Sequence, residues 1–175
     1  MRRLVYSVAT SLDGFIGGPD GAYDWITRDP TIDFAALYTQ FDTLIMGRRT
    51  YELAIKGGQQ LTSMGMGVYI VSTTLKPEDH SAVTVISKEI SQAVATLKAA
   101  SGSKPGKDIW LFGGAVLFRS MLDAGLVDVI RLSVMPIMLG NGIPLLPAGM
   151  RIPLHLDECK HSATGIVQLS YSLVR

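Results

Sequence analysis

The sequence has one cysteine, little charge and no long hydrophobic run. Because Cys159 stands alone among 175 residues, no disulfide can form within the chain, and nothing points to an oxidising compartment. Charged residues make up only 18 %, and 16 Lys and Arg against 15 Asp and Glu leave a formal net charge of +1. That balance offers no broad electrostatic field for nucleic acid or an anionic membrane surface. No apolar run is long enough to span a bilayer.

The N-terminus has only a partial likeness to an export signal. Arg2 and Arg3 precede the apolar stretch Leu4 to Ala9, but polar residues and the charge of Asp13 follow it, without a small-residue cleavage site. We therefore expect a soluble, cytoplasmic protein. Apolar residues make up 47 %, and the chain length favours one domain, residues 1–175, around one substantial core.

Several catalytic and ligand-binding motifs are also missing. His80, His155 and His161 are scattered, without the H-E-x-x-H or paired spacing of metal ligands, so no metal site is predicted. The G-x-G-x-x-G fingerprint and the P-loop are absent, which argues against a Rossmann nucleotide site, a kinase or an ATPase. No G-x-S-x-G elbow supports acyl transfer.

Strand-like and helix-like segments alternate over the first two thirds of the chain. Short apolar runs predict buried strands. Phe34, Leu37, Tyr38 and Phe41 recur at the spacing of one helix face. The predicted strands are Leu4–Ala9, Thr43–Met46, Val68–Val71, Val83–Ile86 and Ile109–Phe112, and further helices are predicted from Gly47, Ile90 and Ala115.

The final third of the chain contains strands alone. Apolar and polar residues alternate along 130–134, where Arg131 and Ser133 indicate a strand with one wetter face. Similar alternation covers 152–156, in which a proline favours an edge position, and 167–173. The pattern predicts an α/β fold: a mixed, mostly parallel sheet flanked by helices, with antiparallel strands at the C-terminal end.

The segments between these elements predict two loops and one buried thiol. Residues 57–67 are expected to form a mobile loop rather than a lid over an apolar substrate, and residues 101–107 a polar loop. Cys159 is expected to pack as a small hydrophobe in a terminal strand.

Three strand ends carry groups suited to a phosphate. Free N–H groups at a helix start attract anions, guanidiniums strengthen that attraction, and paired glycines let phosphates approach the backbone. Each feature alone has a plainer explanation as turn chemistry or a solvated arginine. Together they gain weight, because an open α/β sheet binds ligands at the carboxyl ends of its strands. The segments are 46–50 (MGRRT), 72–74 (STT) and 111–115 (LFGGA).

The order and spacing of these motifs resemble the dihydrofolate reductase-like proteins. The matching segments are 9–17 (ATSLDGFIG), 46–51 (MGRRTY), 71–74 (VSTT) and 112–115 (FGGA). Residues 134–142 (VMPIMLGNG) make the chain most similar to the reductase domain of the bifunctional riboflavin-biosynthesis deaminase-reductase. The likeness spans nearly the whole chain, as a stand-alone, single-domain member without the deaminase domain.

The resemblance implies a reductase that uses NADPH. Two glycines would form a cis peptide against the pyrophosphate, and arginines with hydroxyls would favour a 2′-phosphate. By this resemblance Gly47, Arg48 and Thr50 would hold the adenosine-side phosphates, and Arg49 would join Arg48 in favouring the 2′-phosphate. Ser72 and Thr73 would lie by the adenosine ribose and its 2′-phosphate, Gly113, Gly114, Ala115 and Val116 would meet the pyrophosphate, and Ala9 and Ile16 would flank the nicotinamide.

The candidate catalytic residues also come from the resemblance. Dihydrofolate reductases use a buried carboxylate on the first helix, and Asp29 and Asp33 lie in that region. Asp33 equally suits the first turn of its helix, where a carboxylate meets the positive end of the dipole, and a bound water is the other source of the proton. Trp25 would stand at the mouth of the site, beside a covering loop formed by residues 13–24.

Two positions depart from the riboflavin reductases. Ser7 and Phe112 stand where those enzymes carry Lys and Glu. Without that cation and carboxylate the site is less suited to a phosphorylated aminopyrimidine, which argues against reduction of 5-amino-6-(5-phosphoribosylamino)uracil.

The sequence thus predicts an NADPH-dependent reductase that transfers a hydride to a C=N or C=O of a small, pterin- or pyrimidine-like substrate. The alternative is a non-catalytic nucleotide-binding or ligand-sensing protein that keeps only the cofactor cradle. Relatives of this branch commonly form homodimers, and the C-terminal strands could supply the interface.

Overall fold

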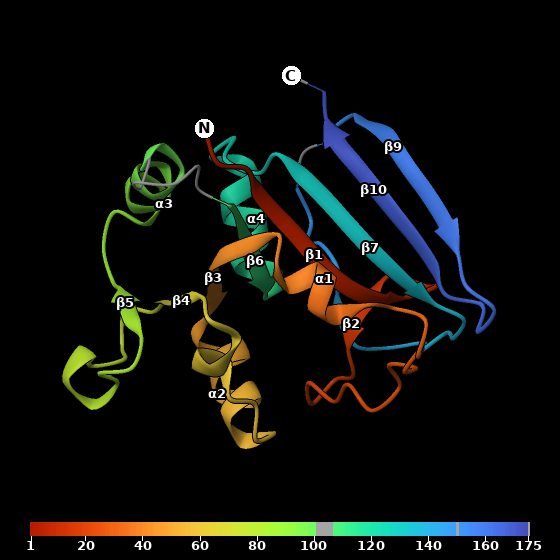
Figure 1. Cartoon of the computed structure of the whole chain (residues 1–175), viewed down its shortest axis with the longest axis horizontal. Coiled ribbons are helices and arrows are strands. Elements are labelled where there is room, and N and C mark those ends of the chain that lie inside the picture. Colours follow the sequence, from red (N-terminus) through yellow and green to blue (C-terminus); the bar gives the residue numbers. More distant parts are fainter. Residues whose placement is uncertain (101–106, 150, 175) are drawn as a thin grey trace.

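The main sheet has eight strands, in the order β5-β4-β3-β6-β1-β7-β10-β9 (Figure 1). The computed structural model describes residues 1–100, 107–149 and 151–174, so the loop predicted at 101–107 lies outside the described residues except for its last one. Every pairing from β5 across to β7 is parallel, whereas β7–β10 and β10–β9 are antiparallel. A separate two-stranded sheet pairs β2 with β8. The predicted α/β fold with its mixed, mostly parallel sheet is confirmed.

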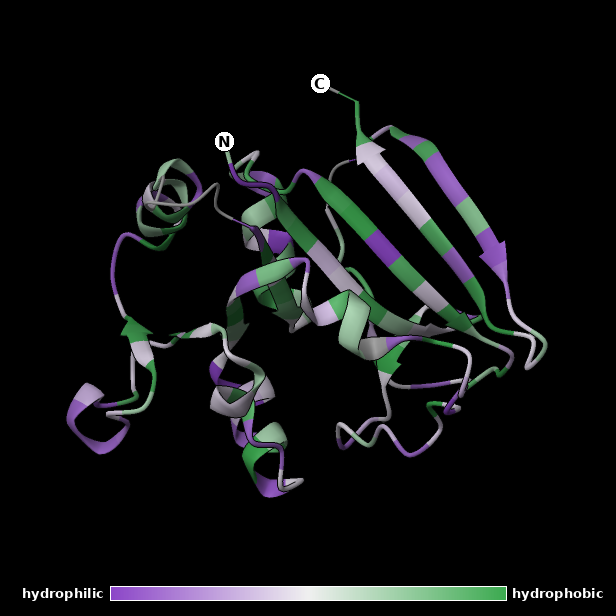
Figure 2. Cartoon of the chain, in the orientation of Figure 1, coloured by the Kyte–Doolittle hydropathy of each residue, from purple (hydrophilic) through white to green (hydrophobic). Residues whose placement is uncertain are grey.

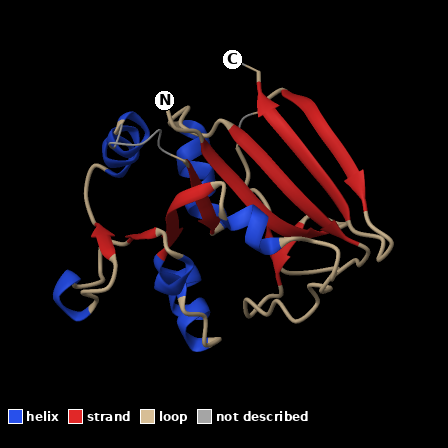
Figure 3. Cartoon of the chain, in the orientation of Figure 1, coloured by secondary structure: helices blue, strands red, loops and turns tan. Residues whose placement is uncertain are grey.

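Helices and strands follow one another along the chain much as the apolar patterns predict (Figure 3). The strands are β1 (Leu4–Ser11), β2 (Phe15–Gly17), β3 (Phe41–Gly47), β4 (Gly67–Val71), β5 (Thr84–Ile86), β6 (Asp108–Gly113), β7 (Val129–Met135), β8 (Ile143–Pro144), β9 (Leu154–His161) and β10 (Val167–Leu173). The helices are α1 (Phe34–Tyr38), α2 (Arg48–Lys56), η1 (Leu61–Met64), η2 (Pro77–Asp79), α3 (Ile90–Ala99) and α4 (Ala115–Asp123). Within the described residues, none of these helices has the length and hydropathy needed to cross a membrane.

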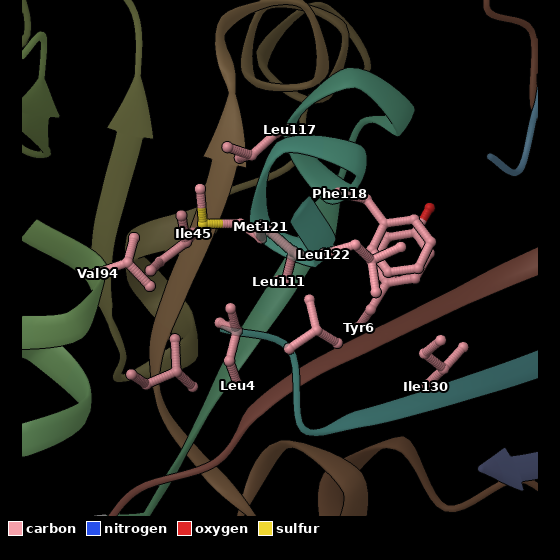
Figure 4. Packing of buried hydrophobic residues seen from close by; sticks show 12 residues of the cluster. Leu4, Tyr6, Ile45, Val94, Leu111, Leu117, Phe118, Met121, Leu122 and Ile130 are labelled. Carbon is pink, nitrogen blue, oxygen red and sulfur yellow. The ribbon is translucent and has the colours of Figure 1, made fainter. Parts of the chain in front are cut away.

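Alternation along the central strands sends side chains into two cores, one on each face of the sheet. On one face Tyr6 of β1 packs with residues of α3 and α4, and its ring centroid lies 3.7 Å from that of Phe118 (Figure 4). On the other face Val5 and Trp110 pack with residues of α1, α2 and η1. The parallel strands therefore read as nearly continuous apolar runs, because they are covered on both sides.

The first helix is shorter than the apolar spacing predicts. It ends at Tyr38, and Phe41 is the first residue of β3 rather than the last residue on the helix face. Phe41 is only 3 % exposed, and its ring centroid lies 5.3 Å from that of Trp110 in β6. Packing in the sheet core has overridden the local helical spacing here.

Two further expectations need correction. The segment 57–67, predicted as a mobile loop, contains η1, and its Leu61 and Met66 are buried in the core. The prediction that Cys159 packs as a small hydrophobe is wrong: its thiol is exposed. Cys159 lies on β9, one of the two edge strands of the sheet, whose eight residues are all exposed.

The wetter face predicted for residues 130–134 continues across the strands beside β7. Arg131 pairs with Ser7 of β1 on one side and with Ser170 of β10 on the other. Glu158 of β9 completes this row by pairing with Ser170. The next row on the same face is Ala9, Ser133, Gln168 and Lys160. Figure 2 shows the hydrophilic positions alternating with apolar ones along β7, β10 and β9.

Candidate functional site

Three parallel strands end together at one edge of the sheet. β3 ends at Gly47, which pairs with Val71, the last residue of β4. Met46 pairs with Gly113, the last residue of β6. α2 follows β3 directly and α4 follows β6 after one residue, so the free N–H groups of both helices lie at this edge. The structure thus brings the three predicted junctions together.

The glycine backbones of two junctions lie close to each other. A Cβ atom on Gly47 would stand 3.9 Å from the amide nitrogen of Gly114, and one on Gly114 would stand 3.2 Å from Oγ1 of Thr50. The Gly113–Gly114 peptide is cis, as predicted. Gly47 and Gly114 are the N-caps of α2 and α4, and neither helix has a side-chain cap. First-turn N–H groups therefore remain available to an anion.

The two arginines at the start of α2 differ in their partners. Arg48 donates from Nε to Glu52 over 2.6 Å and from Nη1 to Oγ1 of Thr74 over 2.5 Å, which fastens α2 to the loop after β4. Arg49 is exposed and makes no ion pair with any residue that the structure describes. The free cation at this edge is therefore that of Arg49.

The hydroxyls after β4 also divide between two roles. Oγ of Ser72 accepts hydrogen bonds from the amides of Thr74 and Leu75, at 3.2 and 3.0 Å, and so orders its own turn. Ser72 is 7 % exposed, whereas Thr73 is exposed and its hydroxyl has no partner in the described part of the chain. Thr73 is thus the hydroxyl of this loop that remains open to a ligand.

A cavity of about 540 Å³ lies beside this edge, on the α1 face of the sheet. Ala9 and Ile16, the residues predicted to flank a nicotinamide, line it together with Met135. The hydroxyl of Thr10 donates to the carbonyl of Phe15 over 3.1 Å, which holds β1 and β2 together at this end. The cavity extends from here across β7 and β10 to β9.

One side of the cavity is aromatic. Trp110 lies between Tyr38 and Phe112, with ring centroids 5.7 and 5.1 Å away, and its Nε1 donates to the carbonyl of Ser7 over 3.0 Å. We call these three residues, which all line the cavity, the aromatic wall. A planar, conjugated ligand is the partner that such a surface favours.

The floor of the cavity is polar and comes from the antiparallel half of the sheet. It consists of Arg131 and Ser133 of β7, Gln168 and Ser170 of β10, and Glu158 and Lys160 of β9, which we call the polar floor. These side chains were missed as site residues by sequence reasoning. The alternation of Arg131 and Ser133 with apolar neighbours carried the signal, but it indicates only a wet face and not what that face contacts.

The structure places the predicted catalytic carboxylates outside the cavity lining. Asp29 is 3 % exposed and accepts hydrogen bonds from the amide and hydroxyl of Thr31 and the hydroxyl of Thr164. The nearby hydroxyls of Ser162, Thr164 and Thr31 hold the pKa of Asp29 far below its usual range. Asp33 is exposed and caps α1 by accepting from the amide of Ala36 over 2.9 Å.

Trp25 lies next to the cavity rather than in its lining, and of the loop before it, residues 13–24, only Ile16 lines the cavity. Nε1 of Trp25 donates to the carbonyl of Ala22 over 3.0 Å, while the two residues that follow Trp25 line the cavity. Asp13 accepts from the hydroxyl of Ser11 and from the amides of Leu139 and Gly140, and these bonds lower its pKa. The loop after β1 is therefore tied to the loop after β7.

Comparison with known proteins agrees with this geometry. Residues 2–168 match the family model of the RibD C-terminal domain. The chain is 35 % identical to the uncharacterized protein YyaP of Bacillus subtilis, over 97 % of this chain and 94 % of that protein.

Solved structures of other proteins share the fold of this chain. A putative riboflavin biosynthesis protein from Shewanella sp. PV-4 superposes with a TM-score of 0.83 at 25 % identity, over all of both chains. The diaminohydroxyphosphoribosylaminopyrimidine deaminase/5-amino-6-(5-phosphoribosylamino)uracil reductase of Thermotoga maritima shares the fold, with a TM-score of 0.72 at 14 % identity. That match covers 99 % of this chain and 57 % of the Thermotoga chain. The chain belongs to the RibD C-terminal domain family.

Proposed function

We propose that this protein is an NADPH-dependent reductase that transfers a hydride to a C=N or C=O of a small planar substrate. One observation carries the proposal. Two helix starts without side-chain caps and a glycine pair converge at one sheet edge, directly beside a cavity of about 540 Å³ lined with aromatic and polar groups. An anionic cofactor fits the first feature, and a planar substrate fits the second.

The chain's own groups fit the phosphates of such a cofactor. A methyl group on Gly114 would crowd Oγ1 of Thr50 at 3.2 Å, so the close approach of this turn to α2 favours glycine. Ala115 and Val116 open α4 and offer backbone N–H groups to the pyrophosphate. Arg49 and Thr73 are free to contact a 2′-phosphate, and Arg48 holds the loop of Thr73 against α2 through Thr74.

Bound NADPH supplies the hydride from its nicotinamide. Ala9 and Ile16 line the cavity end where that ring would lie, and the aromatic wall would hold the acceptor ring against it. Among the described lining residues the one carboxylate is Glu158, which is paired with Lys160 at 2.7 Å. Glu158 and a bound water are therefore the two candidate proton sources at this cavity.

The riboflavin-pathway substrate remains a poor match for this site. Phe112 contributes an apolar ring to the aromatic wall where a riboflavin reductase would offer a carboxylate. Ser7 offers no cation on β1. A planar acceptor that does not depend on that lysine and carboxylate fits the cavity better on these grounds.

The positions of the two predicted acids favour a second candidate function, nucleotide binding without catalysis. Asp29 and Asp33 both accept structural hydrogen bonds, and neither is among the residues that line the cavity. A protein that binds the nucleotide and senses a small ligand, without turnover, needs no such acid.

A fluorescence titration with NADPH and with NADH tests the cofactor site. Wild-type protein is expected to bind NADPH more tightly, and Arg49→Ala to lose much of that preference, by about tenfold in Kd. Arg48→Ala is expected to weaken it less, because Arg48 acts through the Thr74 loop. Gly114→Ala, whose added Cβ would stand 3.2 Å from Oγ1 of Thr50, should weaken the binding of both nucleotides, and a melting curve shows whether the variant is folded.

A substrate panel then separates the two functions. Loss of NADPH absorbance with any aldehyde, imine or pterin establishes the reductase, and tight NADPH binding without turnover across the panel favours the sensor. Folded protein that binds neither nucleotide would rule out both.

A further inference from the structure

The polar floor contains one cation without a carboxylate partner. Among the described residues Arg2, Arg3, Arg48, Arg119, Lys98 and Lys160 each form an ion pair with Asp or Glu. Arg131 is half-buried and forms none; within the described structure its one hydrogen bond runs from Nη1 to Oε1 of Gln40 over 2.7 Å. A guanidinium has five N–H donors, so most of its donors have no protein acceptor.

The charges around Arg131 are already balanced among themselves. Asp108 is bound by Arg3 at 2.6 Å, and Glu158 is bound by Lys160 at 2.7 Å. In the register Ser170 lies between Arg131 and Glu158. The backbones of Arg131 and Glu158 are therefore two strand spacings, about 9 to 10 Å, apart across the sheet. Burial lowers the pKa of Arg131, yet an arginine stays charged at any physiological pH. The unmet charge in the cavity therefore belongs to Arg131.

The surroundings of Arg131 suit an anionic ligand. Ser133, Gln168 and Ser170 line the same floor and offer uncharged donors without adding negative charge. Arg131 lies opposite Ser7 in the register, about 4.8 Å across one strand spacing, and Ala9 lies in the next row. Arg131 and Ala9 thus lie in adjacent rows on the same face of the sheet, and both line the cavity.

We propose that Arg131 anchors an anionic group of the substrate, a carboxylate or a phosphate, so that its planar ring lies along the aromatic wall with the reducible bond toward Ala9 and Ile16. The inference rests on the proposed function, because it names the substrate class of the same cavity. A guanidinium fork binds either group through two hydrogen bonds, which gives both affinity and orientation.

Matched pairs of planar probes test the anchor by direct binding to protein without nucleotide. The first pair is pterin and pterin-6-carboxylate, followed by their own fluorescence; the second is phenol and phenyl phosphate, followed by ligand-observed NMR. The anionic member of a pair is expected to bind wild-type protein at least about tenfold more tightly than the neutral one. The first pair reports a preference for carboxylate, and the second a preference for phosphate.

The variant series isolates the guanidinium. Arg131→Gln should remove the preference for the anionic probe and leave the neutral probe unchanged, and Arg131→Lys should keep only part of it, because the two-pronged geometry is lost. Lys88→Gln, which removes an equal charge from an exposed site before α3, is the control and should behave like wild type. Melting curves of all variants confirm that each one is folded.

The possible outcomes distinguish a failure of the Arg131 anchor from a failure of the proposed reductase function. Equal affinity for both members of each pair, or no binding of either anion up to about 10 mM, overturns the anchor whatever the nucleotide titration gives. An anion preference that survives in Arg131→Gln also overturns it, because the anion then binds elsewhere. Loss of the preference in Arg131→Gln supports the anchor even if NADPH does not bind, in which case only the proposed function fails.

Discussion

At the scale of single residues, Tyr6 has an unusual position for a tyrosine. Its side chain is fully buried beside Phe118, and among the described residues its hydroxyl has no hydrogen-bond partner (Figure 4). Replacing it by phenylalanine removes an unsatisfied polar group and keeps the ring packing. Tyr6→Phe is expected to raise the free energy of unfolding by about 1 kcal/mol, measured by urea denaturation. Tyr23→Phe at a 43 % exposed site serves as the control.

The same burial makes the stability of the protein depend on alkaline pH. Burial raises the pKa of Tyr6 above the unfolded value of about 10. The folded state therefore favours the neutral form of Tyr6. The stability that comes from burying this neutral side chain is fully present below pH of about 10 and is lost as the pH rises toward the folded pKa. Above pH 10, wild-type stability should fall more steeply than that of Tyr6→Phe. Parallel slopes would contradict this prediction.

At the scale of elements, Asp29 joins the segment before α1 to the turn between β9 and β10. Its carboxylate accepts from Thr31 on its own segment and from the hydroxyl of Thr164 in the β9–β10 turn, at 2.6 Å. Those hydroxyls lower its pKa, so the stabilisation is present above the unfolded value of about 4 and is lost as the pH falls toward the folded value.

Asp29→Asn should therefore lower the melting temperature at neutral pH and flatten its decline below pH of about 4. Thermal melts over a pH series measure both effects, with Asp24→Asn at an exposed neighbouring site as the control. A catalytic acid without a structural role would give the opposite pattern: activity lost, melting temperature unchanged.

Sequence patterns could place the elements of the parallel half because those strands are continuous apolar runs between turn signals. The glycine junctions 46–50 and 111–115 could be found for the same reason: their backbone chemistry is local. The polar floor could not, because Arg131, Ser170 and Glu158 become neighbours only through a register that joins residues far apart in the chain. Phe41 was misplaced because the Trp110 ring that holds it comes from β6, far along the chain.

At the scale of the whole molecule, the edge strand β9 is the feature that predicts assembly. All its residues are exposed, including Leu154 at 42 % and Leu156 at 48 %, and an open strand edge offers unpaired backbone groups to another chain. We propose that two copies pair through β9. Size-exclusion chromatography with light scattering should give twice the mass of one chain, and Leu156→Lys should shift it toward a monomer. Ile55→Lys, on α2, should leave the mass unchanged.

Strand pairing changes from parallel to antiparallel at β7, and the two parts of the candidate site come from different parts of the sequence. The proposed phosphate-binding edge comes from residues before 117, whereas the whole polar floor comes from residues 131–170. The proposed phosphate contacts and the polar floor therefore lie in separate stretches of the chain. In the proposed reductase, changes within the C-terminal stretch alter the substrate contacts and leave the proposed phosphate contacts in place.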